Sequence, residues 1–143
     1  MKYIKAAIAV IALVLLDQWT KVLAVTHLMN TNGVTIIPNV FRLYYLENRG
    51  SAFGLMQNQK IFFVIFTILV LAGLTLIYRK IPDTKRMLPL KIAGILIYAG
   101  AIGNFIDRVR QSYVVDFFYF ELINFPIFNV ADIYVTTAAV ALI

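Results

Sequence analysis

Two aspartates, Asp116 and Asp132, stand among aromatic and branched apolar residues in the stretch VVDFFYFELINFPIFNVAD, residues 114–132. Burying a carboxylate in such surroundings is costly, because desolvation penalises its ionised form. The segment from Phe117 to Phe125 is long enough to fold back and bring the two carboxyl groups together. Two carboxyl groups at short range share one proton. The ionised group can take a proton from a water that attacks a carbonyl, while the protonated group hydrogen-bonds that carbonyl. This pattern predicts aspartyl peptidase chemistry, which needs neither a metal nor a cofactor.

Asp132 also has a simpler structural explanation. It follows Asn129 by three residues, shortly after Pro126, and this is the spacing of a capping box at the start of a helix. Its charge would meet the positive end of the helix dipole. Capping alone could therefore account for Asn129 and Asp132. It leaves Asp116 unexplained, since VVDFF contains no turn residue and no neighbouring base.

Two further groups of polar residues lie within apolar runs. Asp17 and Lys21 are four residues apart, so on a helix they share a face in the order that favours an ion pair. The pair lies either at the membrane interface or in a polar site that faces the substrate. Asn104, Asp107 and Arg108 project to one side of a helix. They either close that helix or, because Asn104 lies one turn inside it, face the bundle interior or a wet cavity.

Other catalytic chemistries lack the necessary residues. The chain has no cysteine, and His27 is its single histidine, which leaves little for a histidine-rich metal site or a serine triad. A serine–lysine dyad would need Ser51 or Ser112 beside a lysine, and no spacing favours one. The charge of Arg108 would oppose a divalent cation held by the carboxylates. No glycine-rich phosphate loop or dinucleotide fingerprint is present. The sequence therefore predicts no metal and no cofactor.

The composition indicates a membrane protein. Hydrophobic residues make up 62% of the 143 residues and charged residues 14%, with a mean hydropathy of +0.84. A soluble domain is nearer half apolar and about a quarter charged. We expect one integral membrane domain over residues 1–143, of the membrane α-helical class with four transmembrane helices. The expected helices cover residues 3–25, 60–79, 88–107 and 127–143, each approximately, with the last one truncated.

The connections differ in character. A small outer β-sheet is expected over residues 27–58, because FRLYYL (residues 41–46) favours strands. We expect a turn at residues 31–33 and a return through NRGSAFG, residues 48–54. A basic cytoplasmic link comes next, at residues 80–87. The outer segment 108–126 is predicted to be irregular or to form a short helix.

The basic residues predict the orientation. The start of the chain and residues 79–91 carry seven lysines and arginines against one acid, whereas the rest carries six against six. The more basic side is expected to face the cytoplasm, which puts both termini inside and the aspartates at the outer face. The basic residues form no patch interleaved with polar surface, so a nucleic-acid partner is not expected.

Five short motifs carry a family resemblance. DQWTK, NRGSAFG, GNFIDR, VVDF and FNVAD, in this order, resemble bacterial prolipoprotein signal peptidase (signal peptidase II), and the resemblance covers essentially the whole chain. It implies that Asp116 and Asp132 are the catalytic pair. Lys21 is added as the partner of Asp17. Supporting or substrate-contacting roles are implied for Asp17, Asn48, Gly50, Asn104, Asp107, Arg108, Asn129 and Ala131.

The resemblance also implies a reaction and partners. The family removes signal peptides from lipoprotein precursors, cutting before a cysteine that already carries diacylglycerol, and the peptide antibiotic globomycin blocks it. Prolipoproteins, membrane lipids and globomycin-like inhibitors are the expected partners of a monomer in the bacterial cytoplasmic (inner) membrane. One departure is that only residues 133–143 come after Asp132, so the last helix lacks its inner end.

Two other functions remain open on the residues alone. A small proton- or ion-relay transporter subunit would also carry acids in apolar runs, but at several depths, whereas here they gather on one side. A non-catalytic lipid-binding or assembly subunit would use the polar motifs as helix caps and contacts between helices, and would tolerate Asp-to-Asn changes.

Overall fold

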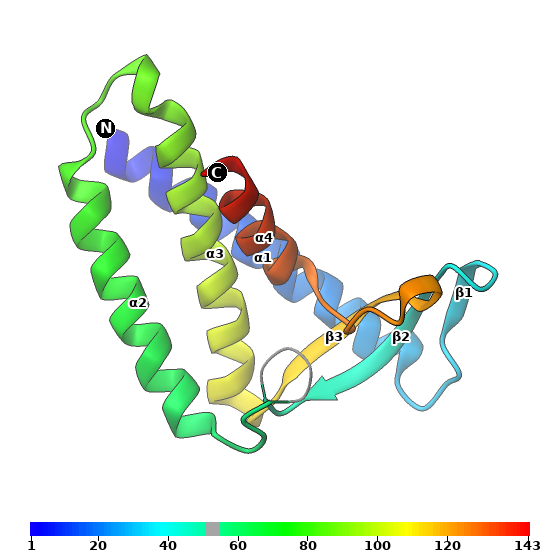
Figure 1. Ribbon diagram of the computed structural model, residues 1–143. Helices are drawn as coiled ribbons and strands as arrows, with labels where there is room; N and C mark the ends of the chain where they lie inside the picture. The colour runs from blue at the N-terminus through cyan, green and yellow to red at the C-terminus, as the bar shows by residue number, and fades with distance from the viewer. Residues whose placement is uncertain (51–54) are drawn as a thin grey trace.

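The computed structural model describes residues 1–50 and 55–143; the last four residues of NRGSAFG, Ser51 among them, lie outside the described part. Figure 1 shows a bundle of helices with a small sheet beside one end. The helices of the described part are α1 (Lys2–Leu28), α2 (Lys60–Lys80), α3 (Leu88–Gln111) and the shorter α4 (Val130–Ala141). A 3-10 turn, η2 (Lys85–Met87), leads into α3.

The apolar composition of the helices explains why they form and where they lie. In the described residues, α1, α2 and α3 are each long and apolar enough to cross a membrane, whereas the twelve-residue α4 is shorter. No residue of α2 is buried by protein, although its sequence is almost wholly apolar. A helix that is apolar all round and only partly covered by protein is suited to contact with lipid.

A three-stranded antiparallel sheet has the order β1-β2-β3. Strands β1 (Val34–Ile37) and β2 (Phe41–Asn48) form a hairpin. The tight turn between them contains Asn39 at φ +60°, a backbone conformation that asparagine tolerates. The predicted turn at residues 31–33 is present in the chain but serves another purpose. It leads from α1 into β1, with Gly33 at φ +76°.

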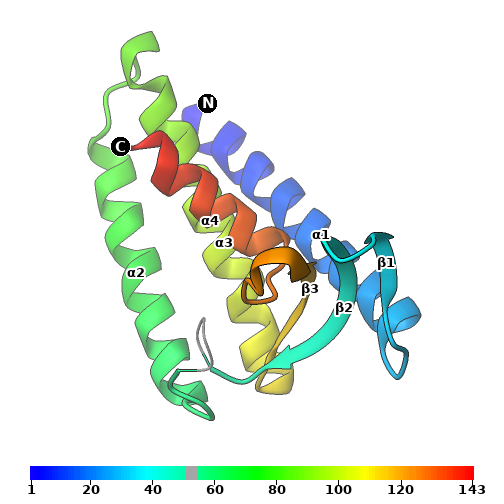
Figure 2. The same cartoon turned by 45° about the vertical axis from the view of Figure 1, so that its right-hand side comes forward.

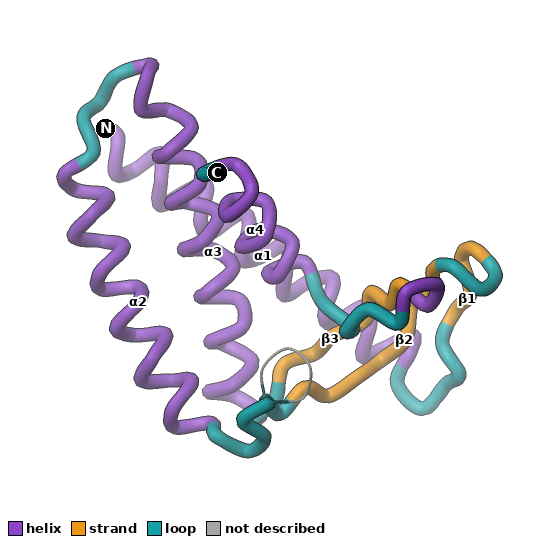
Figure 3. The backbone as a smooth tube through the Cα atoms, viewed as in Figure 1, coloured by secondary structure: helices purple, strands orange, loops and turns teal. Residues whose placement is uncertain are grey.

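The prediction for the outer segment 108–126 was wrong in one respect. Residues Val114–Phe120 form strand β3, which pairs with β2 through Leu46 opposite Asp116 and Asn48 opposite Val114. Before this strand, α3 continues to Gln111, beyond its predicted end at residue 107, and after the strand the 3-10 turn η3 spans Glu121–Ile123. Figure 3 shows this strand between the end of α3 and the start of α4. The aromatic run FFYF suits a strand, and long-range pairing with β2 decides its conformation.

Helix α3 is the centre of the bundle. It packs against α1, α2 and α4, as the rotated view in Figure 2 also shows. Small residues of α3 allow a close approach of α4, because a side chain on Gly100 would collide with the Ala131 carbonyl. Just before α4 begins, the backbone nitrogen of Phe117 donates to the Phe128 oxygen at 3.0 Å. This bond ties β3 to the segment that enters α4.

Candidate active site

The carboxylate of Asp116 lies on β3 and is 1% exposed. Asn129 donates its side-chain nitrogen to Oδ1 at 2.7 Å, and Asn48 donates to Oδ2 at 3.0 Å. Asn48 is available because it lies two residues beyond Leu46, the residue opposite Asp116 in the sheet register, and therefore on the same face. The pairing of β2 with β3 thus brings the side-chain donor of Asn48, which lies between α1 and α2 in the chain, to the carboxylate of Asp116, which lies between α3 and α4.

The carboxylate of Asp132 stands in the first turn of α4 and forms a complete capping box with Asn129. Asn129 Oδ1 accepts from the Asp132 backbone nitrogen at 3.0 Å, and Asp132 Oδ2 accepts from the Asn129 backbone nitrogen at 3.1 Å. The remaining oxygen, Oδ1, accepts from the side chain of Asn104 at 2.9 Å. The cap predicted from the sequence is therefore present, but it uses only one of the two carboxylate oxygens.

Asn129 connects the two aspartates. Its backbone nitrogen bonds Asp132 and its side-chain nitrogen bonds Asp116, and the same side chain also donates to Asn104 Oδ1 at 3.1 Å. The capping explanation and the paired-carboxylate explanation are therefore compatible, because one residue serves both. All four carboxylate oxygens accept a hydrogen bond from an amide, which fixes both groups in position.

Burial of Asp116 raises its pKa to about 7, and the negative charge of Asp132 contributes to this increase, while the donors Asn48 and Asn129 oppose it. Desolvation disfavours the charged form, and a second carboxylate nearby adds to the cost of ionising both. The pair can therefore hold one proton near neutral pH.

Beneath the pair lies a buried cluster of charges. The Nζ of Lys21 is 2.9 Å from Asp17 Oδ2 and 3.2 Å from Asp107 Oδ2, and it donates to Asn104 Oδ1 at 3.0 Å. Asp17 is 0% and Lys21 3% exposed. The Asp17–Lys21 pair is buried by protein and does not line the groove that the two catalytic candidates face. It is an internal support, joined through Asn104 to Asp132.

Asp17 also fixes the start of α4. Its Oδ1 accepts from the backbone nitrogen of Ala131, which is fully buried, at 2.9 Å. Room for this carboxylate exists because residue 103 is glycine; a Cβ there would lie 3.0 Å from the Asp17 carboxyl carbon and 3.3 Å from Ala131 Cβ. Because residue 103 is glycine, both the Asp17 side chain of α1 and the start of α4 can pack against α3 at this point.

Sequence reasoning missed Gln18. Its side-chain nitrogen donates to Asp107 Oδ1 at 3.0 Å, to the Gly103 oxygen at 3.1 Å and to Asp17 Oδ2 at 3.2 Å. Its place in DQWTK beside Asp17 was the available signal, but consecutive helical residues point in different directions. Asp107 in turn accepts from the backbone nitrogen of Val115 at 3.0 Å, which links α3 to β3 directly before Asp116.

Arg108 holds the connection that carries Asn48. Its guanidinium donates to the Gly50 oxygen at 3.1 Å and lies 4.5 Å from the centre of the Phe63 ring. The nitrogen of Gly50 donates to Asn48 Oδ1 at 3.0 Å, so Arg108 acts on Asn48 through this turn. A planar cation suits both the carbonyl and the ring face.

Both aspartates face a groove of about 1460 Å³. Polar groups of Asn48, Asn104 and Arg108 line it together with the two carboxylates. The charged residues Arg42, Glu47 and Arg49 also belong to the lining, and most of the surface of the wall is apolar. In the described residues, no group of three or more His, Cys, Asp or Glu side chains is arranged to hold a metal ion. A few polar groups in an apolar groove are typical of a binding site for an amphiphilic ligand.

Comparison with known proteins agrees with this site. A model of the family described as signal peptidase (SPase) II matches residues 9–143. The chain belongs to the signal peptidase II family. A lipoprotein signal peptidase of Streptococcus thermophilus is 46% identical over 143 residues, which cover 100% of this chain and 92% of the relative. One of Caldanaerobacter subterraneus is 45% identical over 140 residues, covering 95% and 92%.

Solved structures agree in fold. Two bacterial membrane enzymes determined by the in meso method resemble the chain with TM-scores of 0.85 and 0.84, at 34% and 33% identity. Each likeness covers 96% of this chain, and 84% and 89% of the solved chains respectively. The predicted resemblance and the predicted enzyme class are confirmed. The protein is an aspartyl endopeptidase of the signal peptidase II type in a bacterial membrane, which decides against a transporter or an assembly subunit.

Proposed function

We propose that this signal peptidase II family member removes the signal peptide from diacylglyceryl-modified prolipoproteins, cutting just before the lipid-bearing cysteine, with Asp116 and Asp132 as its catalytic pair. The observation that carries the proposal is the double contact of Asn129, which bonds both carboxylates at the wall of one groove. The names of the relatives, which are lipoprotein signal peptidases, support the substrate class.

The two carboxyl groups share one proton in the resting enzyme. The ionised group takes a proton from a water molecule as the water oxygen attacks the scissile carbonyl carbon, while the protonated group donates to the carbonyl oxygen. A tetrahedral intermediate forms. When it collapses, the carbon–nitrogen bond breaks and the proton taken from water passes to the departing amine. The products are the carboxyl end of the signal peptide and the free amino group of the lipid-bearing cysteine, and the pair again holds one proton.

The remaining site residues position this pair. Asn48, Asn104 and Asn129 orient the carboxylates by donating to them. Arg108 and Gly50 hold the turn from which Asn48 extends. The buried side chains of Asp17, Lys21 and Asp107, with the Ala131 backbone, tie α1 and α3 to the start of α4. Placement within a fraction of an ångström matters, because small errors at a reacting centre lower rates strongly.

The membrane context is inferred from the distribution of charge. We propose four spans, with α4 in the fourth. Both termini would be in the cytoplasm, and the sheet and the two aspartates at the outer face. The lipid chains and apolar signal peptide would then approach from the bilayer and the scissile bond from the interface. All of the groups assigned to the chemistry come from one chain, so we propose that a monomer is active.

The test is cleavage of a purified prolipoprotein by the purified protein in detergent, followed by gel shift. A precursor with diacylglycerol on its cysteine should be cut, the same precursor without the lipid should not, and globomycin should block the reaction. Asp116→Asn and Asp132→Asn should each abolish turnover while still binding inhibitor, and the double variant should be no worse than either, since residues of one mechanism are not additive. Glu121→Gln, at an acid outside this pair, is the matched control. A metal chelator should have no effect.

Substantial cleavage by either single Asn variant in a well-folded protein would reject the proposed pair and leave Asp132 only its capping role.

A further inference from the structure

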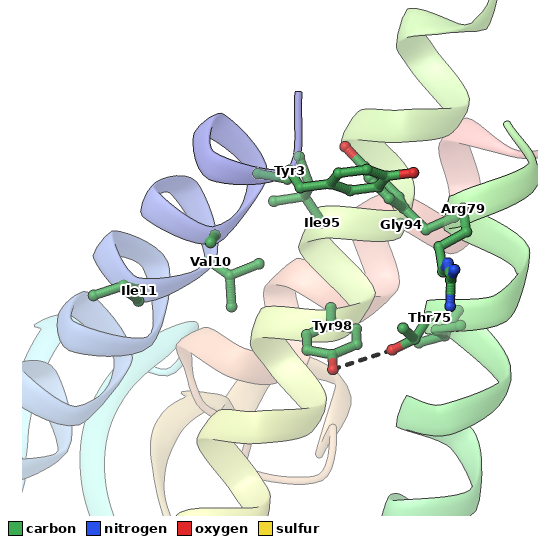
Figure 4. Close-up of a pocket in the computed structure, with 12 residues that line it drawn as sticks. Tyr3, Val10, Ile11, Thr75, Arg79, Gly94, Ile95 and Tyr98 are labelled. Atoms are coloured by element: carbon green, nitrogen blue, oxygen red, sulfur yellow. Dashed lines mark hydrogen bonds between the residues drawn. The ribbon is translucent and has the colours of Figure 1, made fainter. Parts of the chain in front are cut away.

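A second cavity, of about 400 Å³, is lined by residues of α1, α2 and α3 and shares no lining residue with the active-site groove. Its residues come from the first half of α1, the last turns of α2 and the first half of α3, which lie at the end of the bundle away from the sheet (Figure 1). Its walls are almost entirely apolar, with Val10 and Ile11 on α1 and Ile95 on α3 (Figure 4). The polar groups at its edge are hydroxyls and one guanidinium, which belong to Tyr3, Thr75, Tyr78, Arg79 and Tyr98.

The cavity exists because α1 and α2 do not pack closely against each other. Helix α2 packs against α3 and has few direct contacts with α1. Small residues line the facing surfaces: Ala6 and Ala7 on α1 and Gly94 on α3. Across the hollow, the hydroxyls of Thr75 and Tyr98 lie 3.3 Å apart and join α2 to α3 (Figure 4). A space of this composition, open at the side of a membrane helix, favours hydrocarbon over water.

The cation Arg79 lines this cavity. Further basic residues belong to nearby parts of the chain: Lys80 ends α2, Lys85 and Arg86 are in η2, and Lys5 is near the start of α1. Across residues 1–50 and 55–143, none of these five cations forms an ion pair with a carboxylate. The acid at this end, Asp83, pairs with the buried Lys91. Arg79, at the wall of an apolar cavity, therefore has no carboxylate partner in the described part of the chain.

We propose that this cavity binds an anionic phospholipid, with one acyl chain lying between α1, α2 and α3 and the phosphate at Arg79. Basic pockets between transmembrane helices bind anionic head groups, and a guanidinium can bind two phosphate oxygens at once. The acyl chain supplies the contacts that α2 lacks with α1, and so fixes α2 against the bundle. The proposal rests on this cavity and its charges, and not on the reaction assigned to the aspartates.

The experiment uses the full chain in lipid vesicles that contain a phosphatidylglycerol with a photoreactive group in one acyl chain. After illumination, peptide mapping should find the label on residues 74–79 and 94–98. A phosphatidylcholine probe with the same acyl chain should label these residues about fivefold less, which is the effect of one basic residue near an anionic membrane surface. Equal labelling by the two probes would overturn the proposal, because it would show a space that takes any neighbouring lipid.

Two variants with matched controls distinguish the contribution of the Arg79 charge to lipid binding from the contribution of the cavity volume. Arg79→Gln should lower phosphatidylglycerol labelling about fivefold, whereas Arg110→Gln, which removes the same charge in the last turn of α3, should not. Gly94→Leu fills the cavity and should abolish labelling by both probes. Gly73→Leu is its control, because nothing lies within 4 Å of a Cβ added there.

Two results would contradict the lipid site. If Arg79→Gln kept its selectivity for phosphatidylglycerol, the phosphate would not be bound by Arg79. This conclusion would hold even if Gly94→Leu failed to fold. A disulfide between two copies of a Leu74→Cys variant, formed at the cavity in place of the lipid label, would instead assign the surface to a dimer. Cleavage of prolipoprotein is measured separately, so failure of the lipid proposal is distinguishable from failure of the aspartate mechanism.

Discussion

The side-chain nitrogen of Asn129 lies 2.7 Å from a carboxylate oxygen of Asp116, so the residue that caps α4 also holds an acid of the sheet. The two tasks can be separated by substitution. Serine is about as good an N-cap as asparagine, but its hydroxyl is too short to take over the contact with Asp116. We expect Asn129→Ser to keep the cap of α4 while cleavage falls by one to two orders of magnitude, roughly the cost of misplacing a reacting group.

Asn129→Ala should lose both tasks. Its free energy of unfolding should fall by about 1 kcal/mol, the usual cost of a lost N-cap, together with the loss of cleavage. Thermal unfolding in detergent and the gel-shift assay measure the two effects side by side. Equal activity of Asn129→Ser and the unchanged protein would mean that the contact with Asp116 does not matter to the reaction.

The raised pKa of Asp116 predicts how stability changes with pH. Burial, and then the charge of Asp132, raise this pKa to about 7 from its ordinary value of 3.8. Between these two pH values the folded protein holds a proton that the unfolded chain has lost. The contribution of Asp116 to stability is therefore fully present below about pH 4 and decreases as the pH rises to 7. Thermal unfolding from pH 4 to 8 should show a smaller decrease in Asp116→Asn, and an identical pH dependence would contradict the assignment.

The same ionisation predicts the pH dependence of activity. A pair with one proton is active between its two macroscopic ionisations, so the rate should be bell-shaped in pH. The alkaline limb should lie near the pKa of about 7, because above it the shared proton is lost. The measurement is the initial cleavage rate across this range with a saturating lipidated precursor. A rate that keeps rising above pH 8 would mean that no protonated carboxyl group is needed.

The buried cation Lys21 is expected to be a large source of stability. It contacts Asp17 at 2.9 Å and Asp107 at 3.2 Å, so Lys21→Met leaves two buried carboxylates without a counter-charge. Breaking a buried pair in this way costs about 3–5 kcal/mol. Adding Asp107→Asn should recover part of the loss, because it removes one of the uncompensated charges. Chemical unfolding of the single and double variants tests this, and an additive double variant would contradict the coupling.

A feature of the fold or of the site could be predicted from the sequence when it depends on residues close together in the chain. The capping box of Asn129 and Asp132 and the shared face of Asn104, Asp107 and Arg108 depend on local spacing, and all are visible in the sequence. Strand β3 is not, because its conformation depends on pairing with β2, nearly seventy residues earlier for Asn48 and Asp116. A local pattern contains no information about such a partner.

The interior of the bundle was harder to predict for a similar reason. Periodicity shows that Asp17 and Lys21 share a helix face, but it does not show which helix covers that face. The glycine at 103, which makes room for the Asp17 carboxylate, is recognisable only when α1, α3 and α4 are assembled. Gln18 was missed because its three partners come from two helices.

Arg108 is expected to need its planar shape as well as its charge. It donates to the Gly50 oxygen at 3.1 Å and covers the Phe63 ring at 4.5 Å, and a lysine ammonium cannot make both contacts in the same way. Arg108→Lys should insert normally and lose about tenfold or more of its cleavage rate, because the turn that carries Asn48 is released. Arg110→Lys is the control at the same end of α3. Full activity of Arg108→Lys would show that only the positive charge at this position matters to the reaction.

The orientation in the membrane can be tested with single cysteines, because the chain has none of its own. Asn32 and Thr84 are both exposed. Asn32 belongs to the segment between α1 and β1 and Thr84 to the link between α2 and α3, and these two segments lie at opposite ends of the bundle (Figure 1). With the basic end inside, a membrane-impermeant thiol reagent should label Asn32→Cys in intact cells, and Thr84→Cys only after the cells are lysed. Labelling both after lysis controls for reactivity. The reverse pattern in intact cells would put Asp116 and Asp132 at the cytoplasmic face, where a lipoprotein precursor held across the membrane could not present its lipid-bearing cysteine to them from outside.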